Sequence, residues 1–225
     1  MARIFISRKI ADDTDWVIEA RQQGHHVFGY SCIQTSTVKI PPLGDFDWVF
    51  FSSSECVHHF LPQFNVGNAK IGAMGIGTAL TLDKQNIKAD FIGQHSAPEK
   101  VAHDFQKVLL PQSRILFPQS EQTRNSIAPL LTNSDIERVT TYRTSDVQVA
   151  HADAAIFIFS SPSNVKSYLS QHALPFNAQC IAFGPTTAQA LKDSNARNIH
   201  TLENVDHKEI MNAIKLSLSG LEGTM

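Results

Sequence analysis

An internal repeat constrains the fold of this chain more than any other feature of its sequence. The segment CIAFGPTTAQAL at residues 180–191 aligns with IGAMGIGTALTL at residues 71–82. The preceding segments align as well, since DWVFFSSSECVHHFL at residues 47–61 matches DAAIFIFSSPSNVKSYL at residues 153–169. The copies are offset by about 110 residues, which is far longer than the repeats of a solenoid. The repeat therefore predicts two related lobes rather than an array of small units.

Each copy of the repeat indicates two consecutive strand–turn–helix units. In the second copy, the apolar residues 180–183 predict a buried strand that ends at Gly184. Thr186 is the expected N-cap residue of the helix that follows. Such units form parallel sheets covered by helices, and ligands bind at the carboxyl ends of the strands. The sequence therefore predicts an α/β fold with two similar lobes, whose mostly parallel sheets are flanked by helices.

Strand counting assigns the remaining segments to the lobes. The first 31 residues indicate two strands, which the second copy of the repeat needs to complete its sheet. We therefore expect a discontinuous lobe of residues 1–31 and 150–225 and an inserted lobe of residues 45–137. The segments at residues 32–44 and 138–149 are extended and rich in β-branched residues, which predicts two crossing linkers with a cleft between the lobes. Within the inserted lobe, a helix is also expected at residues 123–131.

Composition excludes several classes of protein. Hydrophobic residues make up 42% of the 225 residues and charged residues 18%, as in folded soluble proteins. A net charge of −2 predicts no broad basic surface for nucleic acid. The sequence has no apolar run as long as a membrane span, and its first residues indicate a strand rather than a signal peptide. Three isolated cysteines favour a reducing cytoplasm over disulfides or a metal site.

Motifs of the common cofactor-dependent and nucleophilic enzymes are missing from the sequence. The chain has no His/Cys cluster with metal-ligand spacing, and His58-His59 is an adjacent pair whose side chains point to different faces. It also has no Walker loop, no dinucleotide-binding loop and no nucleophile elbow. The polar residues that remain stand at strand ends and helix starts, where backbone N–H groups are free.

The order of several short motifs resembles that of uroporphyrinogen-III synthases over nearly the whole chain. The segments that carry the resemblance are FFSS at residues 50–53 with Val57, Gly75 with Thr78-Ala79, LFP at residues 116–118 with Arg124, VTTYRT at residues 139–144, SSPS at residues 160–163 with Val165, and GPTTA at residues 184–188. The chain departs from the usual pattern at Ser120, which replaces a glycine, and at Ser54, which replaces a proline. Ser7-Arg8-Lys9 also replaces the usual Thr-Arg-Pro.

The resemblance implies a lyase of haem biosynthesis that cyclises the linear tetrapyrrole hydroxymethylbilane to uroporphyrinogen III and inverts the last ring. Loss of the substrate's hydroxyl gives an azafulvene, which the terminal pyrrole attacks at its substituted carbon to form a spiro intermediate. The enzyme's task is therefore mainly to hold one folded geometry. The resemblance further implies that no metal or organic cofactor is needed. From the composition we expect a cytoplasmic protein that binds neither nucleic acid nor membrane, and we expect it to be a monomer.

The same resemblance implies a set of site residues. Carboxylates of the substrate are expected at helix N-termini and beside cations at strand ends. The expected substrate-binding residues are Arg8, Ser52, Ser53, Gly75, Thr78, Arg124, Ser160, Ser161, Ser163, Gly184, Thr186 and Thr187. Tyr142 is the expected catalytic residue, a proton or hydrogen-bond donor to the departing hydroxyl. Because it lies on the second crossing segment, its side chain is expected to face the cleft rather than a lobe core.

Each of these residues also has a simpler interpretation. Serines and threonines at helix starts are most often caps, and Tyr142 in a strand satisfies β-propensity alone. A non-catalytic two-lobed binding protein, or a regulatory relative that keeps the fold and loses the chemistry, is the alternative function. Product analysis with hydroxymethylbilane distinguishes these alternatives.

Overall fold

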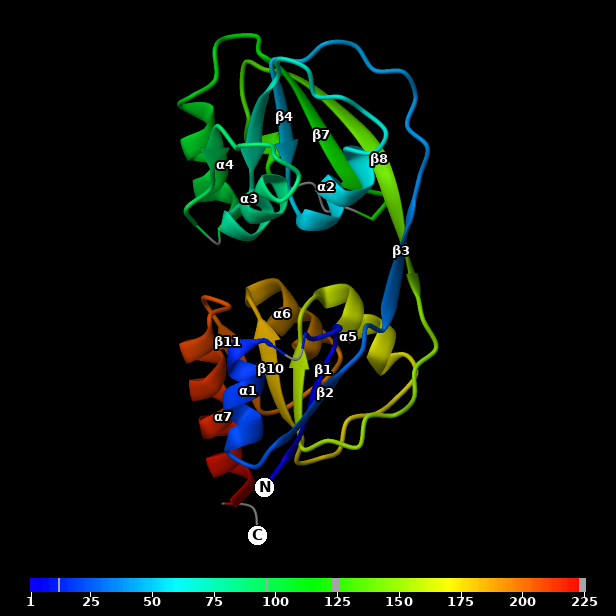
Figure 1. Ribbon diagram of the computed structural model, residues 1–225, viewed down its shortest axis with the longest axis vertical. Coiled ribbons are helices and arrows are strands. Elements are labelled where there is room, and N and C mark those ends of the chain that lie inside the picture. Colours follow the sequence, from blue (N-terminus) through cyan, green and yellow to red (C-terminus); the bar gives the residue numbers. More distant parts are fainter. Residues whose placement is uncertain (12, 96, 123–125, 223–225) are drawn as a thin grey trace. The chain divides into compact units, whose positions relative to one another are not determined.

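The chain forms two compact units in its computed structural model, which describes residues 1–11, 13–95, 97–122 and 126–222 (Figure 1). Unit 1 combines Met1–Gln34 with Asp146–Met225, and unit 2 is Thr35–Ser145. Each unit contains its own sheet and its own helices. The predicted α/β class, with two mostly parallel sheets flanked by helices, is confirmed.

Unit 1 is a parallel five-stranded sheet with helices on both faces. The strand order is β11-β10-β9-β1-β2, and every neighbouring pair is parallel. Residues of β1 alternate between two cores: Ile4 and Ile6 pack with helices α1 and α7, whereas Phe5 packs with α5 and α6. The strands are β1 (Arg3–Ile6), β2 (His26–Gly29), β9 (Ile156–Phe159), β10 (Gln179–Phe183) and β11 (Ile199–Leu202), and the helices are α1 (Asp15–Gln22), α5 (Pro162–Leu169), α6 (Pro185–Asp193) and α7 (His207–Glu222).

Unit 2 is built in the same way around six strands in the order β3-β8-β7-β4-β5-β6. Val49 and Phe51 of β4 pack against α2 and α3, and Trp48 and Phe50 pack against α4 on the other face. The strands are β3 (Ile33–Thr37), β4 (Trp48–Phe51), β5 (Lys70–Ala73), β6 (Phe91–Ile92), β7 (Arg114–Ser120) and β8 (Asp135–Asp146). The helices are α2 (Ser54–Phe60), α3 (Ile76–Asp83) and α4 (Pro98–Gln106), with a 3₁₀ turn η1 (Ala128–Leu130).

The helix expected at residues 123–131 is wrong over the part that the structure describes. Residues 126–131 contain only the 3₁₀ turn η1, while residues 123–125 lie outside the described residues. Pro129 explains the short element, because a proline inside an α-helix removes one hydrogen bond and clashes with the carbonyl four residues earlier.

Two glutamines one repeat apart make the same hydrogen bonds in the two units. In unit 2, Gln63 donates from Nε2 to the carbonyl oxygen of Val38 at 3.0 Å and accepts at Oε1 from the Ile40 N–H at 3.2 Å. In unit 1, Gln171 donates to the carbonyl oxygen of Val147 at 3.0 Å and accepts from the Val149 N–H at 3.0 Å. The repeat therefore extends to the segments TSTVKI at residues 35–40 and TSDVQV at residues 144–149, and each glutamine anchors one of them.

Removal of either anchor is expected to destabilise its unit. Gln171→Leu leaves backbone groups of Val147 and Val149 without these partners, which costs about 1–3 kcal/mol when such groups stay buried. We expect the same range for Gln63→Leu, measured as a shift in urea unfolding. Gln85→Leu, at an exposed glutamine of unit 2, is the control and should change stability by less than about 0.5 kcal/mol. Equal shifts in all three variants would contradict the anchoring role.

Candidate functional site

In unit 1, the candidate site lies where the central parallel strands end. Ser7 follows β1 and Ser160 follows β9, and these strands are neighbours. The Ser160 N–H donates to Ser7 Oγ at 2.9 Å, and Ser160 Oγ donates to the Ser7 carbonyl oxygen at 3.1 Å. Ser161 is the N-cap residue of α5, and its Oγ accepts from the Asn164 N–H at 3.3 Å. Hydrogen bonds thus hold the predicted site residues Ser160 and Ser161 at the carboxyl edge of the sheet.

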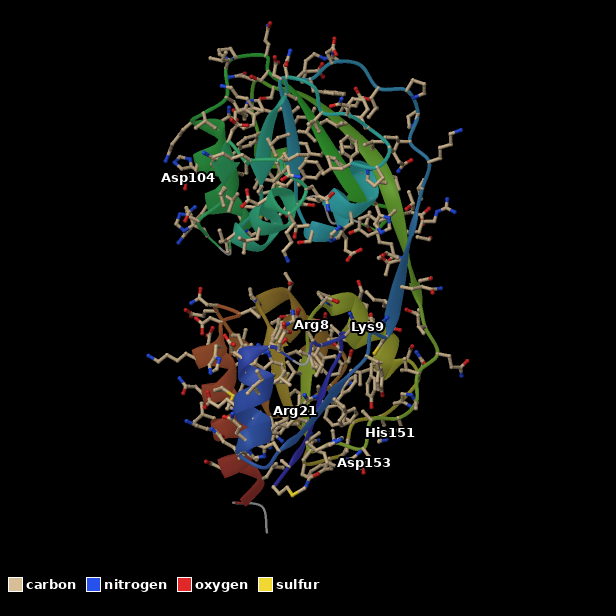
Figure 2. The ribbon with its side chains drawn as sticks, in the orientation of Figure 1. Arg8, Lys9, Arg21, Asp104, His151 and Asp153 are labelled. Atoms are coloured by element: carbon tan, nitrogen blue, oxygen red, sulfur yellow. The ribbon has the colours of Figure 1, made fainter. Side chains whose placement is uncertain are left out.

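Arg8 brings a fixed positive charge to the same edge. Its guanidinium lies over the ring of Phe183, the last residue of β10, at 5.1 Å from the ring centroid. Desolvation lowers the pKa of Arg8, but a guanidinium remains charged at neutral pH. Figure 2 shows Arg8 and Lys9 at the end of unit 1 towards which the strand arrows of Figure 1 point. This edge can therefore attract a carboxylate.

The turn into α6 differs from its prediction in one respect. Thr186 was expected to cap the helix, but α6 begins at Pro185 and its N-cap residue is Gly184, so Thr186 lies exposed inside the first turn. Proline is favoured at the first helical position because its fixed φ suits the helix and its missing N–H is not needed there. Thr187 is buried, and its Oγ1 donates to the Phe183 carbonyl oxygen at 3.0 Å. Ser163 lies half-buried in the first turn of α5.

Unit 2 repeats this arrangement at the ends of β4 and β5, which are parallel neighbours. Ser53 is the N-cap residue of α2, with φ −160° and ψ 162°, close to the angles of −161° and 157° at Ser161 in unit 1. Ser52 precedes it and is exposed. Gly75 is the N-cap residue of α3, and Thr78 is buried in the first turn of that helix. The structure thus brings these four predicted residues together at one edge of the sheet.

Tyr142 does not lie where it was predicted. Its side chain is only 9% exposed and packs in the same core of unit 2 as Val139, three residues earlier on β8. Side chains three apart on a regular strand point to opposite faces. Here β8 is irregular, since Gln119 pairs with Thr140 but Ser120 pairs with Tyr142, which leaves Thr141 as an extra residue. This bulge turns Tyr142 into the core.

The hydroxyl of Tyr142 nevertheless reaches the N-terminal end of α2. It interacts with the side chains of Ser53 and Cys56, and Ser53 Oγ donates to Cys56 Sγ at 3.3 Å. The phenol ring stacks on His59, with ring centroids 5.0 Å apart and an interplanar angle of 18°. Burial and the neighbouring Cys56 raise the pKa of Tyr142 to about 12. The phenol therefore stays protonated at neutral pH and is suited to donating a hydrogen bond.

Three residues of these edges were not predicted as site residues. Ser7 appeared in the sequence only as a departure from Thr-Arg-Pro, although a hydroxyl after a buried strand was a usable signal. Cys56 and His59 stand three and six residues after Ser53, a spacing that places them near one face of α2. The bonds that involve them come from distant strands, which the local sequence does not reveal.

Other parts of the structure bear on the remaining predictions. Arg124 lies outside the described residues. All three cysteines are free and buried. In the part of the chain that the structure describes, no group of three or more His, Cys, Asp or Glu residues is arranged to hold a metal ion, and no helix has the length and apolar character of a membrane span.

A cavity of about 740 Å³ lies in unit 2 at the opposite, amino-terminal ends of β4 and β5. Its walls come largely from loops, including residues 44–47, 64–69 and 110–113. It contains none of the predicted site residues. In parallel α/β sheets, ligands bind at the carboxyl ends of the strands, so the two edges described above remain the candidate site.

Comparison with known proteins relates the chain to uroporphyrinogen-III synthases, in sequence through a family model and in fold through solved structures. A family model described as uroporphyrinogen-III synthase HemD matches residues 15–211. No curated protein matches the chain in a sequence comparison. Among solved structures, the uroporphyrinogen-III synthetase of Helicobacter pylori is similar with a TM-score of 0.67 and 19% identity, over 97% of this chain and 99% of that chain. A mutant uroporphyrinogen III synthase of Thermus thermophilus gives a TM-score of 0.58 and 13% identity, over 97% and 99% of the two chains.

The two kinds of match support different conclusions. At these identities the solved structures establish a common fold. The family model covers most of the chain, including every predicted site residue except Arg8. The chain belongs to the uroporphyrinogen-III synthase family.

Proposed function

We propose that this protein cyclises hydroxymethylbilane to uroporphyrinogen III in haem biosynthesis, as a lyase that releases water and inverts the last ring. The observation that carries the proposal is the family match over residues 15–211. The substrate is a flexible chain of pyrroles with many carboxylates, and it cyclises unaided to the unflipped isomer. The enzyme must therefore impose one folded geometry before the terminal pyrrole attacks.

The carboxyl edges of the two sheets supply groups suited to holding such a substrate. The N–H groups that precede the first intrahelical hydrogen bonds are those of Ile76 and Gly77 in α3, Ser163 in α5, and Thr186 and Thr187 in α6, since Pro162 and Pro185 have no N–H and the Asn164 N–H donates to Ser161 Oγ. These groups can bind carboxylates, and the helix dipoles favour negative charge there. Arg8 adds a guanidinium at the edge of unit 1. Because Thr187 Oγ1 and Ser53 Oγ are already engaged within the protein, we assign binding mainly to backbone N–H groups rather than to these hydroxyls.

Tyr142 is our proposed donor to the departing hydroxyl. Its phenol is protonated and lies beside the Ser53 end of α2. A hydrogen bond to the leaving oxygen stabilises the negative charge that develops as the C–O bond breaks. The leaving hydroxide takes the N–H proton of the pyrrole ring that becomes the azafulvene. That nitrogen regains a proton when the rearranged terminal pyrrole loses its own, so water is the only other product. A pKa of about 12 makes Tyr142 a weak acid, which favours donation of a hydrogen bond over full proton transfer.

The remaining parts of the proposal concern partners and place in the cell. We propose a cytoplasmic monomer that uses no cofactor and binds the tetrapyrrole but neither nucleic acid nor membrane. Support comes from the net charge of −2 and the three free, buried cysteines.

The test is product analysis with freshly generated hydroxymethylbilane. The oxidised products are separated by chromatography, and the fractions of isomers I and III are compared with a reaction that lacks the protein. We expect faster consumption of substrate and predominantly isomer III. Isomer I at the uncatalysed rate would identify the alternative, a binding or regulatory relative without the chemistry.

A further inference from the structure

One face of α2 contacts the Tyr142 side chain at three positions. Ser53 and Cys56 interact with its hydroxyl, and His59 stacks on its ring. Ser53 and Cys56 therefore contact the phenol oxygen, whereas His59 contacts the face of the aromatic ring. The orientation of the Tyr142 ring determines where its hydroxyl oxygen lies. His59, which stacks on the ring, therefore influences the position of this hydroxyl.

His59 is itself held by three polar partners. Its Nδ1 is hydrogen-bonded to Thr37 Oγ1 at 2.8 Å and its Nε2 to Thr35 Oγ1 at 3.0 Å, both on β3. Glu55 Oε2 lies 3.5 Å from Nε2. The Thr35 hydroxyl donates to Glu55 Oε2 at 2.9 Å, so it accepts from His59 and places a proton on Nε2. In the neutral imidazole, Thr37 then donates to Nδ1.

These bonds fix the plane of the imidazole, because both ring nitrogens are engaged and the side chain is only 14% exposed. The neighbouring His58 is exposed on another face of α2 and provides a natural comparison. A ring fixed in this way restricts tilting of the phenol that stacks on it. The network joins α2, β3 and β8 within unit 2.

We infer that His59 is a positioning residue for the reaction, and that its clamped imidazole holds the Tyr142 ring so that the hydroxyl stays at the Ser53 end of α2. The inference rests on the proposed role of Tyr142 in the cyclisation. It assigns no proton transfer to His59. The imidazole acts through the tyrosine, by its stacked face and its two hydrogen bonds to β3.

The experiment measures kcat, KM and the isomer ratio for His59→Leu, His59→Phe and the control His58→Leu, each with Tyr142 intact and with Tyr142→Phe. We expect His59→Leu to lower kcat about 5- to 10-fold, as stacking and ring orientation are lost together, with KM changed less than about twofold. His59→Phe keeps an aromatic face but loses both hydrogen bonds to β3, so its kcat should lie between that of His59→Leu and that of the parent protein. His58→Leu should match the parent protein.

The double variants separate positioning from general packing. Once Tyr142→Phe has removed the hydroxyl, His59→Leu should lower kcat no further, since it acts only through that hydroxyl. An equal fall in both backgrounds, or a kcat for His59→Phe no higher than that for His59→Leu, would overturn the inference. If Tyr142→Phe alone leaves turnover unchanged while isomer III still forms, the role of Tyr142 fails and the positioning inference falls with it, but the enzyme's function stands.

A second variant keeps the inference testable if His59→Leu does not fold. Thr37 is exposed on β3, and Thr37→Val removes the hydrogen bond to Nδ1 without touching α2 or the core. We expect a two- to threefold fall in kcat for this variant in a well-folded protein. A kcat equal to that of the parent would contradict the claim that the network holds the ring.

Discussion

Replacement of Tyr142 by phenylalanine is expected to slow formation of uroporphyrinogen III by roughly 10- to 100-fold at saturating substrate. A hydrogen bond to a group that becomes charged contributes about 1.5–3 kcal/mol, which corresponds to that range of rates. Phenylalanine keeps the ring that stacks on His59 and packs in the core of unit 2, so folding and substrate binding should survive. The product should remain mostly isomer III, because the change removes help for the leaving group and not the folded geometry.

Tyr30 is the matched control for this variant. Burial also raises the pKa of Tyr30 to about 12, but its hydroxyl donates to the carbonyl oxygen of Ala150 in unit 1. Tyr30→Phe should therefore leave turnover unchanged within about twofold. Equal rates for Tyr142→Phe and the parent protein, measured on folded samples, would reduce Tyr142 to a core residue.

Gly184→Val should have the second large effect, on stability and activity together. Gly184 has a φ of +87°, in the region that side chains with a Cβ disfavour. With a ψ of 167°, this conformation is essentially restricted to glycine, and it costs an L-residue on the order of 1–3 kcal/mol, most for a β-branched side chain. The residue also caps α6, so a strained backbone here displaces the N–H groups at the start of that helix. We expect the midpoint of urea unfolding to fall to a lower urea concentration. We also expect Gly184→Val to lose more activity than Thr187→Ala.

The repeat provides the control at Gly75, which occupies the same place in unit 2. Its φ of −169° is ordinary extended backbone, and a Cβ added there would lie 3.9 Å from the Gly93 carbonyl oxygen. Both variants lose a favoured N-cap glycine, but only Gly184→Val also strains the backbone, so Gly75→Val should lose less stability than Gly184→Val by about 1–3 kcal/mol. If both valine variants lose equal stability, backbone strain at Gly184 is not the reason for its glycine.

Local patterns predicted most of the fold, because strand–turn–helix units depend on residues close in sequence. Ser53 and Ser161 are such local signals, and both are N-cap residues with engaged side chains. The failures involve longer-range or competing effects. Pro129 is incompatible with the α-helix expected there, and Pro185 displaced the cap from Thr186 to Gly184.

The environment of Tyr142 is the clearest case of information that the sequence alone does not contain. A strand of twelve residues predicts alternation, and alternation predicts the wrong face for this side chain. The bulge at Thr141 arises from pairing with β7, and the His59 contact arises from α2. Both partners are far from Tyr142 in sequence. The family resemblance selected the residue as a candidate, but only the structure reveals what orients it.

The most direct test of the proposed mechanism is the isomer ratio produced by protein that has been exhaustively chelated and dialysed. In this mechanism, backbone N–H groups, Arg8 and Tyr142 position the substrate, and no metal or organic group takes part. The treated protein should therefore convert hydroxymethylbilane to uroporphyrinogen III at the rate of untreated protein. Loss of isomer III that returns only when a metal ion or a dialysable compound is added back would contradict this mechanism.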